Sequence, residues 1–190
     1  MSDCIKNILI TQIEYEILKC LLPDDSKSFT QAIYYYDTED TLLNKLGTSC
    51  RIEEFNAKHI AYISIDAETE KVEKSKNVKG PFDRSFFSGL NVKYQGRMII
   101  EKNILYKDVL IEISLAKNTY LTEEDYEIDI SYVSGQEYLV EHLLFYYQRQ
   151  ISECMNLGND FDFNLQGRQY KSRARRFFFR KKHLEYLMTR

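Results

Sequence analysis

Residues that break regular structure, or that build metal and disulfide sites, are scarce in this chain. Seven Gly and two Pro among 190 residues leave little room for flexible linkers or low-complexity tracts. Three histidines lie far apart, and four cysteines are scattered without a Cys-x-x-Cys pair. A disulfide framework, a zinc site and a histidine-based metal site are therefore disfavoured, and we expect buried free thiols at Cys4, Cys20, Cys50 and Cys154.

Long apolar runs are also absent. No segment approaches the length of a membrane span, and the start of the chain lacks the basic and apolar regions of a signal peptide. We therefore expect a cytoplasmic protein without a membrane partner. Hydrophobic content of 44% and charged content of 29% are typical of globular proteins. The length fits one domain with a sizeable core, so the prediction is a single domain over residues 1–190.

Charge is distributed unevenly along the chain. Residues 1–167 contain 17 Lys and Arg against 28 Asp and Glu, whereas residues 168–190 contain nine Lys and Arg against one acid. The sequence therefore predicts an acidic body with a basic C-terminal segment. Aromatic side chains are interleaved with these bases, a composition typical of surfaces that bind RNA by charge and stacking. The alternative is that the aromatic side chains pack on the body and the bases pair with its acids.

The most regular pattern in the chain runs from Asp125 to Tyr132. Polar and apolar residues alternate strictly there, and a strand places successive side chains on opposite faces. Asp125, Glu127 and Asp129 would therefore share one face. Three stacked acids are tolerable where that face is fully solvated, or where a divalent metal or a cluster of Lys and Arg neutralises it.

Periodicity predicts few helices and about eight strands. Thr11 caps a first helix, Gly47 closes a short second one, and Asn56-Ala57 joins a hairpin. Residues 67–80 are charged and weakly patterned, which indicates a solvated loop or a frayed strand. Because most strands are joined by short connections, we expect an α+β fold, with an antiparallel sheet or eight-stranded barrel and helices packed outside. The remaining predicted elements are strands at 29–36, 48–55, 58–66, 91–95, 98–105, 109–116 and 125–133, and helices at 136–155 and 170–190.

The parity of each strand sorts polar from apolar side chains. One face collects both signs of charge, whereas the opposite face is largely apolar. In a closed barrel the polar faces would line a wet lumen suited to a polyanion held by Arg and Lys, with carboxylates binding Mg²⁺ or Mn²⁺. In an open sheet the same face would be solvated. The polar set is Ser49, Arg51, Glu53, Phe55, Ile60, Tyr62, Ser64, Asp66, Ile100, Lys102, Ile104, Glu112, Ser114, Ala116, Asp125, Glu127, Asp129 and Ser131.

Three segments occur in an order and spacing that fit one known family over about residues 1–178. They are 31–38 followed by Gly47 and residues 50–52, then 115–121 followed by 125–129, and finally 172–177 with its Arg-Phe pair. On these segments the chain resembles the CYTH family, the triphosphate tunnel metalloenzymes.

The resemblance implies an eight-stranded antiparallel β-barrel that forms a tunnel, with phosphoryl-transfer chemistry inside it. Family members hydrolyse inorganic triphosphate, thiamine triphosphate or RNA 5′-triphosphate ends, and some cyclise ATP. Basic side chains cradle the triphosphate, and acidic side chains bind the divalent metal. The resemblance assigns phosphate binding to Arg51, Lys102 and Arg176, and binding of Mg²⁺ or Mn²⁺ to Glu127 and Asp129.

Several family positions are changed in this sequence. The Glu-x-Glu-x-Lys motif of the first strand is Asp3, Ile5 and Asn7, the second Arg of an Arg-x-Arg strand is Glu53, and an expected Lys is Ser64. Losing one charged transition-state contact commonly costs about 10²–10³ in rate. We therefore assign no catalytic residue.

Three interpretations of function stay open. The first is a Mg²⁺- or Mn²⁺-dependent triphosphatase, a phosphoric anhydride hydrolase acting on a small triphosphate. The second is a catalytically inactive CYTH-fold protein that binds a triphosphate, a polyphosphate or another anion, or serves as a scaffold. The third is RNA binding through the basic C-terminal segment at 168–190, the one place where a nucleic-acid partner is expected.

Overall fold

The computed structural model describes residues 3–66, 71–121, 123–156, 165, 168 and 172–188. None of the described helices is both long and apolar enough to cross a membrane. The helices are α1 (Gln12–Lys19), α2 (Leu42–Lys45), α3 (Glu137–Cys154) and α4 (Arg173–Met188), with a 3-10 turn, η1, at Arg84–Phe87. The strands are β1 (Asp3–Ile10), β2 (Ser28–Asp37), β3 (Thr48–Phe55), β4 (Lys58–Asp66), β5 (Lys71–Val78), β6 (Lys93–Lys107), β7 (Ile111–Tyr120) and β8 (Glu123–Val133).

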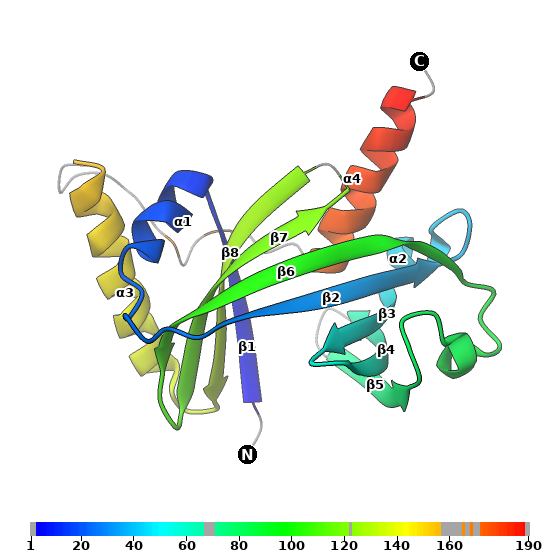
Figure 1. Cartoon of the computed structure of the whole chain (residues 1–190), viewed down its shortest axis with the longest axis horizontal. Coiled ribbons are helices and arrows are strands. Elements are labelled where there is room, and N and C mark those ends of the chain that lie inside the picture. The colour runs from blue at the N-terminus through cyan, green and yellow to red at the C-terminus, as the bar shows by residue number, and fades with distance from the viewer. Residues whose placement is uncertain are drawn as a thin grey trace. The chain divides into compact units, whose positions relative to one another are not determined.

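Eight strands form one antiparallel sheet, in the order β1-β8-β7-β6-β2-β3-β4-β5 (Figure 1). The predicted α+β class, with eight antiparallel strands and few helices, is confirmed. β1 and β5 are the first and last strands in this order, and no pairing joins them among the described residues.

Contacts divide the chain into two compact units. Unit 1 comprises Met1–Phe29, Glu101–Asn118 and Glu124–Tyr170, and unit 2 comprises Thr30–Ile100, Thr119–Glu123 and Lys171–Arg190. Strands β2, β6, β7 and β8 contribute residues to both units. The single-domain interpretation of residues 1–190 stays a prediction.

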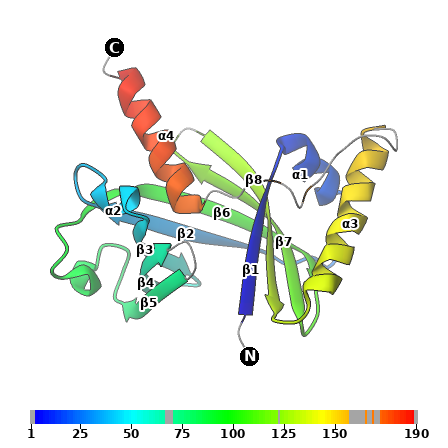
Figure 2. The same ribbon diagram turned by 180° about the vertical axis from the view of Figure 1, so that it is seen from behind.

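Unit 1 packs α1 and α3 against the apolar face of its strands. Thr11 begins α1 with the predicted cap, because its hydroxyl accepts from the Glu14 N–H while the Glu14 carboxylate accepts from the Thr11 N–H. The two helices lie side by side when seen from either side (Figure 1, Figure 2). The core beneath them includes Ile8, Ile10, Tyr15, Leu18, Ile111, Ile113, Leu115, Ile128, Ile130, Val140, Leu144, Tyr147 and Ile151.

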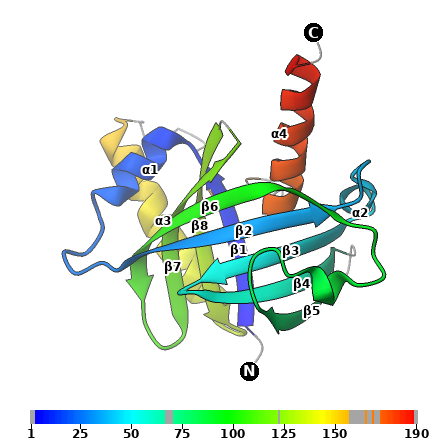
Figure 3. The same cartoon turned by 45° about the vertical axis from the view of Figure 1, so that its right-hand side comes forward.

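Unit 2 is built on the β3–β4 hairpin. Asn56 and Ala57 both have positive φ, 49° and 59°, as a two-residue turn between twisted strands requires, so the predicted hairpin is confirmed. The segment between β5 and β6 crosses in front of β3, β4 and β5 (Figure 3). Its Phe87 and Val92 close a core that also contains Ala32, Tyr34, Tyr36, Cys50, Ile52 and Ala61.

The structure resolves two points that the sequence left open or divided differently. Residues 71–78 form β5, which pairs along its whole length with β4, so the strand alternative and not the loop holds for this part of the charged 67–80 segment. The predicted strands at 91–95 and 98–105 are parts of one strand, β6. This strand continues through Gly96, which has a φ of 146°. Outside the described part of the structure lie the side chains of Asp3 and Asp66 and residues 67–70, 169–171 and 189–190.

The cysteines are free thiols, as the sequence predicts, but the expectation that all are buried was wrong. Only Cys50, in the core of unit 2, is buried, and this burial raises its pKa to about 12. Cys4 is half-buried, and Cys20 and Cys154 are exposed. Both exposed thiols lie at the ends of helices, Cys20 at the end of α1 and Cys154 at the end of α3.

Helix α4 rests on unit 2 through two aromatic side chains. Phe177 is fully buried and stacks on Tyr35 with ring centroids 4.6 Å apart, and Phe178 meets the same ring edge-on at 5.9 Å. Arg180 forms an ion pair with Glu123. The packing alternative for the basic segment is therefore confirmed for these residues, whereas Phe179 is 70% exposed and the end of α4 extends away from the strands (Figure 1).

Candidate functional site

The carboxylate of Asp129 lies at the centre of a polar cluster in unit 1. β1 and β8 pair so that Asn7 stands opposite Asp129. The Asn7 Nδ2 atom donates to Asp129 Oδ1 over 2.5 Å, and the Lys102 ammonium forms an ion pair with Asp129 Oδ2. Asp129 is buried. A predicted phosphate ligand, Lys102, and a predicted metal ligand, Asp129, are therefore in direct contact.

Glu127, the second predicted metal ligand, is fully buried on the same face of β8. Asn118 of β7 donates through Nδ2 to Glu127 Oε1 and to Asp125 Oδ1, each over 2.8 Å. Asn118 thus bridges two acids of the neighbouring strand. Its own Oδ1 atom is buried and accepts no hydrogen bond from any described residue. An orphaned buried acceptor is costly, so a cation or a donor placed there would be stabilised.

Sequence reasoning missed Asn118 as a site residue. It shares the parity of Ser114 and Ala116 along β7, which already assigned that face to the polar set. This parity could have identified Asn118. The family resemblance, however, assigns roles to charged side chains, and an amide carries no charge.

The oxygen donors in this cluster fit Mg²⁺ or Mn²⁺. Glu127, Asp129 and the Asn118 Oδ1 atom are hard ligands, which these cations prefer. No group of three or more His, Cys, Asp or Glu able to hold a metal occurs in the part of the chain that the structure describes. Two carboxylates and one amide oxygen therefore fit a cation that takes its remaining ligands from water and phosphate oxygens, and do not form a closed structural site.

Arg51 of β3, a predicted phosphate ligand, lies in unit 2 and is enclosed by acceptors. Its Nε donates to Glu53 Oε1 over 2.6 Å, its Nη2 to Glu73 Oε2 over 2.8 Å, and its Nη1 to Ser64 Oγ over 3.0 Å. The guanidinium also lies 4.5 Å from the centroid of the Tyr62 ring. Burial lowers the pKa of Arg51, but Glu53 and Glu73 outweigh that effect and raise the pKa overall.

These contacts give a physical reason for two departures from the family pattern. Glu53 and Ser64 stand where the resemblance leads us to expect cations, and both accept hydrogen bonds from Arg51. The positive charge of Arg51 is thus balanced inside the protein. The Ser49 Oγ atom, two residues earlier on the same face, is buried without a hydrogen-bond partner among the described residues.

Arg176, the third predicted phosphate ligand, also belongs to unit 2. It is buried in α4, immediately before the Phe177 ring that stacks on Tyr35. The structure therefore brings Lys102, Glu127 and Asp129 together in unit 1 and places Arg51 and Arg176 in unit 2. Their roles in binding phosphate or metal stay predictions.

Solved structures of CYTH-type proteins share this fold. A candidate adenylate cyclase of Bacillus halodurans matches with a TM-score of 0.61 and 15% identity, over 94% of this chain and 100% of its own. A candidate adenylyl cyclase of Hippeastrum with a dominant triphosphatase activity gives 0.58 and 15%, over 78% and 86%. The PH1819 protein of Pyrococcus horikoshii gives 0.58 and 13%, over 95% and 99%.

These likenesses establish the fold. The chain has the CYTH-type triphosphate tunnel fold, and the resemblance drawn from its sequence motifs is confirmed at that level. No family model matches the sequence, and no curated protein matches it. The chain is therefore a divergent example of the fold, and its activity has to be argued from its own residues.

Proposed function

We propose that this chain binds a small triphosphate, or a related phosphorylated anion, together with a divalent cation. The proposal rests on one observation: Lys102 and Asp129 are in contact inside a buried polar cluster on a triphosphate tunnel fold. A structural neighbour with dominant triphosphatase activity supports a triphosphate as the ligand. In unit 1, Lys102 would hold a phosphate oxygen, and Glu127 and Asp129 would hold Mg²⁺ or Mn²⁺.

Metal binding and phosphate binding are coupled in this arrangement. Lys102 and Asp129 neutralise each other, so Lys102 is released to a phosphate only when another cation takes its place beside Asp129. Leaving one member of a buried ion pair without a partner costs about 3–5 kcal/mol. The exchange is therefore favourable when a divalent cation and a phosphate arrive together, each replacing one half of the pair.

The bound cation would neutralise phosphate charge and polarise a phosphorus–oxygen bond. The protein's own contribution is positioning. Asn118 holds the Glu127 carboxylate from one side, and Asn7 holds that of Asp129, so both acids are oriented before any ligand binds.

Two arginines are proposed phosphate ligands in unit 2. The buried Ser49 hydroxyl, on the same face as Arg51, offers a further donor. Arg51 must leave Glu53 and Glu73 to reach a phosphate, so we expect it to contribute less than an arginine without carboxylate partners. The proposed phosphate-binding role of Arg176 is tested by Arg176→Gln, which should weaken triphosphate binding.

The enclosed state of Arg51 favours a second candidate function, a binding protein that does not hydrolyse its ligand. A cation that is already balanced stabilises developing transition-state charge poorly. The fold and the acidic pair would then serve recognition alone.

The deciding experiment combines calorimetric titration of inorganic triphosphate, with and without Mg²⁺ or Mn²⁺, with phosphate release from inorganic triphosphate, thiamine triphosphate and ATP. Glu127→Gln should abolish metal-dependent binding. Glu124→Gln is the matched control, because this carboxylate lies on the other face of β8 and pairs with Lys117. It should leave binding unchanged.

Each outcome selects one function. Turnover that is lost in Glu127→Gln would establish a triphosphatase. Binding without turnover would establish the inactive binding protein. Wild-type protein that binds no triphosphate with either metal would contradict both proposals and leave the scaffold interpretation.

A further inference from the structure

Unit 2 carries a concentration of exposed cations that the proposed phosphate site does not use. Between Glu73 and Arg97 the chain has six Lys and Arg against two acids, in a protein whose net charge is −3. All six cations are exposed. We call them, with Phe82 and Tyr94, the 73–97 surface; its cations are Lys74, Lys76, Lys79, Arg84, Lys93 and Arg97.

Two aromatic rings of this surface are partly exposed and pack on a buried ring beneath them. Phe82 and Tyr94 pack edge to face with centroids 5.5 Å apart, yet Phe82 is 64% and Tyr94 is 44% exposed. Both contact the buried ring of Tyr34, at 5.9 and 6.4 Å. The Tyr34 hydroxyl in turn donates to Glu54 over 2.7 Å. The exposed rings therefore rest on a fixed layer and present their remaining apolar surface to solvent.

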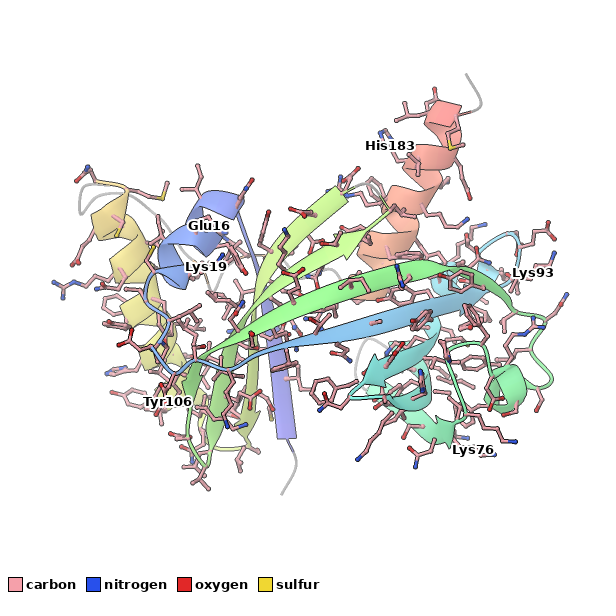
Figure 4. All side chains as sticks on the ribbon, in the orientation of Figure 1. Glu16, Lys19, Lys76, Lys93, Tyr106 and His183 are labelled. Carbon is pink, nitrogen blue, oxygen red and sulfur yellow. The ribbon has the colours of Figure 1, made fainter. Side chains whose placement is uncertain are left out.

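Four of the cations lie close to these rings along the chain, Lys79 and Arg84 around Phe82 and Lys93 and Arg97 around Tyr94. Lys76 of β5 shares a sheet face with Tyr34, because successive strand pairs place Tyr34, Ile52, Ala61 and Lys76 opposite one another. Arg97 lies near the Tyr34 hydroxyl and acts to lower its pKa, against the larger raising effects of burial and Glu54. Lys76 and Lys93 both project outward from unit 2 (Figure 4). Lys93 pairs with Glu39, but both side chains are exposed, so that pair is weak and screened. Lys74 and Lys76 form no ion pair with another residue of the described chain.

This surface is separate from the face that carries Arg51. Tyr35 stands opposite Arg51 in the β2–β3 pairing, and Tyr34 points to the other side of the same strand. A ligand on the 73–97 surface would therefore meet Tyr34, Phe82 and Tyr94 without meeting Arg51.

We propose that the 73–97 surface binds single-stranded nucleic acid, with bases stacked on Phe82 and Tyr94 and phosphates held by the flanking cations. Clustered Lys and Arg fit a polyanion, and exposed rings fit the flat faces of unpaired bases. Inorganic polyphosphate and acidic peptides would use the same cations but gain little from the rings. The aromatic contribution is thus what distinguishes this ligand from other polyanions.

The test is fluorescence anisotropy with the full chain and a labelled oligouridylate of about 12 nucleotides, between about 50 and 200 mM salt. About four or five phosphate contacts give a log–log salt slope near −3, since each contact contributes about −0.7. The Phe82→Ala/Tyr94→Ala double variant should bind about tenfold more weakly or worse. Lys76→Glu/Lys79→Glu should flatten the slope by about 1 to 1.5.

Two exposed residues elsewhere serve as controls. Tyr138 on α3 is 71% exposed, and Tyr138→Ala should leave affinity unchanged. Lys182→Glu, on the basic helix α4, should also leave it unchanged. Circular dichroism of every variant would show that the fold is kept.

Three results would overturn the proposal. The first is no binding at the lowest salt. The second is binding that is insensitive to the two aromatic substitutions and displaced equally well by inorganic polyphosphate of the same charge. The third is binding lost in Lys182→Glu and kept in both 73–97 variants, which would locate the ligand on α4. Saturating inorganic triphosphate should not displace the oligonucleotide, so this result is separable from the triphosphate proposal.

Discussion

A Cβ atom added at Gly96 would lie 2.7 Å from the Cζ atom of Phe177. The backbone of β6 therefore passes directly beneath the ring that anchors α4. Gly96 also has a φ of 146°, a conformation that other residues rarely adopt. The close approach and the backbone conformation together require glycine here. Because Arg176 directly precedes Phe177 on α4, this contact also positions Arg176 within unit 2.

Gly96→Ala is expected to destabilise the protein by about 1–3 kcal/mol, because the new methyl group must displace a buried aromatic ring. Urea denaturation would measure the loss. Gly80→Ala is the control, since no atom lies within 4 Å of the added Cβ, and its effect should stay within about 0.5 kcal/mol. Equal stabilities for the two variants would refute the packing argument.

Asp129→Asn should separate the two halves of the proposed metal–phosphate coupling. The substitution removes a proposed metal ligand and also releases Lys102 from its ion pair. We expect triphosphate binding to become weaker and independent of Mg²⁺, whereas the wild type requires the metal. Calorimetry with and without Mg²⁺ checks this. A variant that keeps the full metal dependence of the wild type would show that Asp129 does not couple the two ligands.

Asn118→Asp should turn a neutral bridge into a third carboxylate beside Glu127 and Asp125. Close carboxylates repel, so the variant should melt at a lower temperature than the wild type without metal. Mg²⁺ should restore more of its stability than it adds to the wild type, because the cation neutralises the new charge. Thermal denaturation over a Mg²⁺ series measures both effects. If Mg²⁺ raised the two melting temperatures equally, this cluster would not be the metal site.

Acid should weaken the pair formed by Glu14 and Arg168. The guanidinium donates to both carboxylate oxygens, over 2.6 and 2.7 Å. Burial alone would raise the Glu14 pKa, but hydrogen bonds from Arg168 and Thr11 outweigh it and hold that pKa below its usual value of 4.5. Because the folded-state pKa is the lower one, the pair contributes its full stability above the unfolded-state pKa and loses it as pH falls through the folded-state pKa.

The expected observation is a stability difference between wild type and Glu14→Gln that is large at neutral pH and shrinks in acid. Urea denaturation across a pH series measures it. Glu16→Gln, on a residue that projects from α1 into solvent (Figure 4), provides the comparison and should track the wild type throughout. A Glu14→Gln difference that is constant with pH would show that charge does not hold this contact.

Local patterns were enough to predict most of the fold. Strict alternation from Asp125 to Tyr132 located β8 and sorted its faces, and Thr11 marked the start of α1. Both signals depend on neighbours within a few residues, so no knowledge of the tertiary structure was needed. The resemblance then identified the type of fold, which the likeness to solved structures confirms.

The interactions between strands could not be predicted in the same way. β5 carries lysines and few apolar residues, so its sequence alone does not favour a strand. Its pairing with β4 is what stabilises the extended conformation. Glu73 was missed as a partner of Arg51 for this reason. The Lys102–Asp129 contact joins residues of β6 and β8, whose order in the sheet cannot be read from alternation.

Strand β5 is the last in the sheet, and along one side its backbone pairs with no other described strand. Such an edge is a template on which a strand from another molecule can add. Lys74 and Lys76 project from it, and two approaching copies would bring these like charges together. The cations proposed to attract a nucleic acid therefore also discourage self-association, and a variant that neutralises both lysines should lose solubility before it loses its fold.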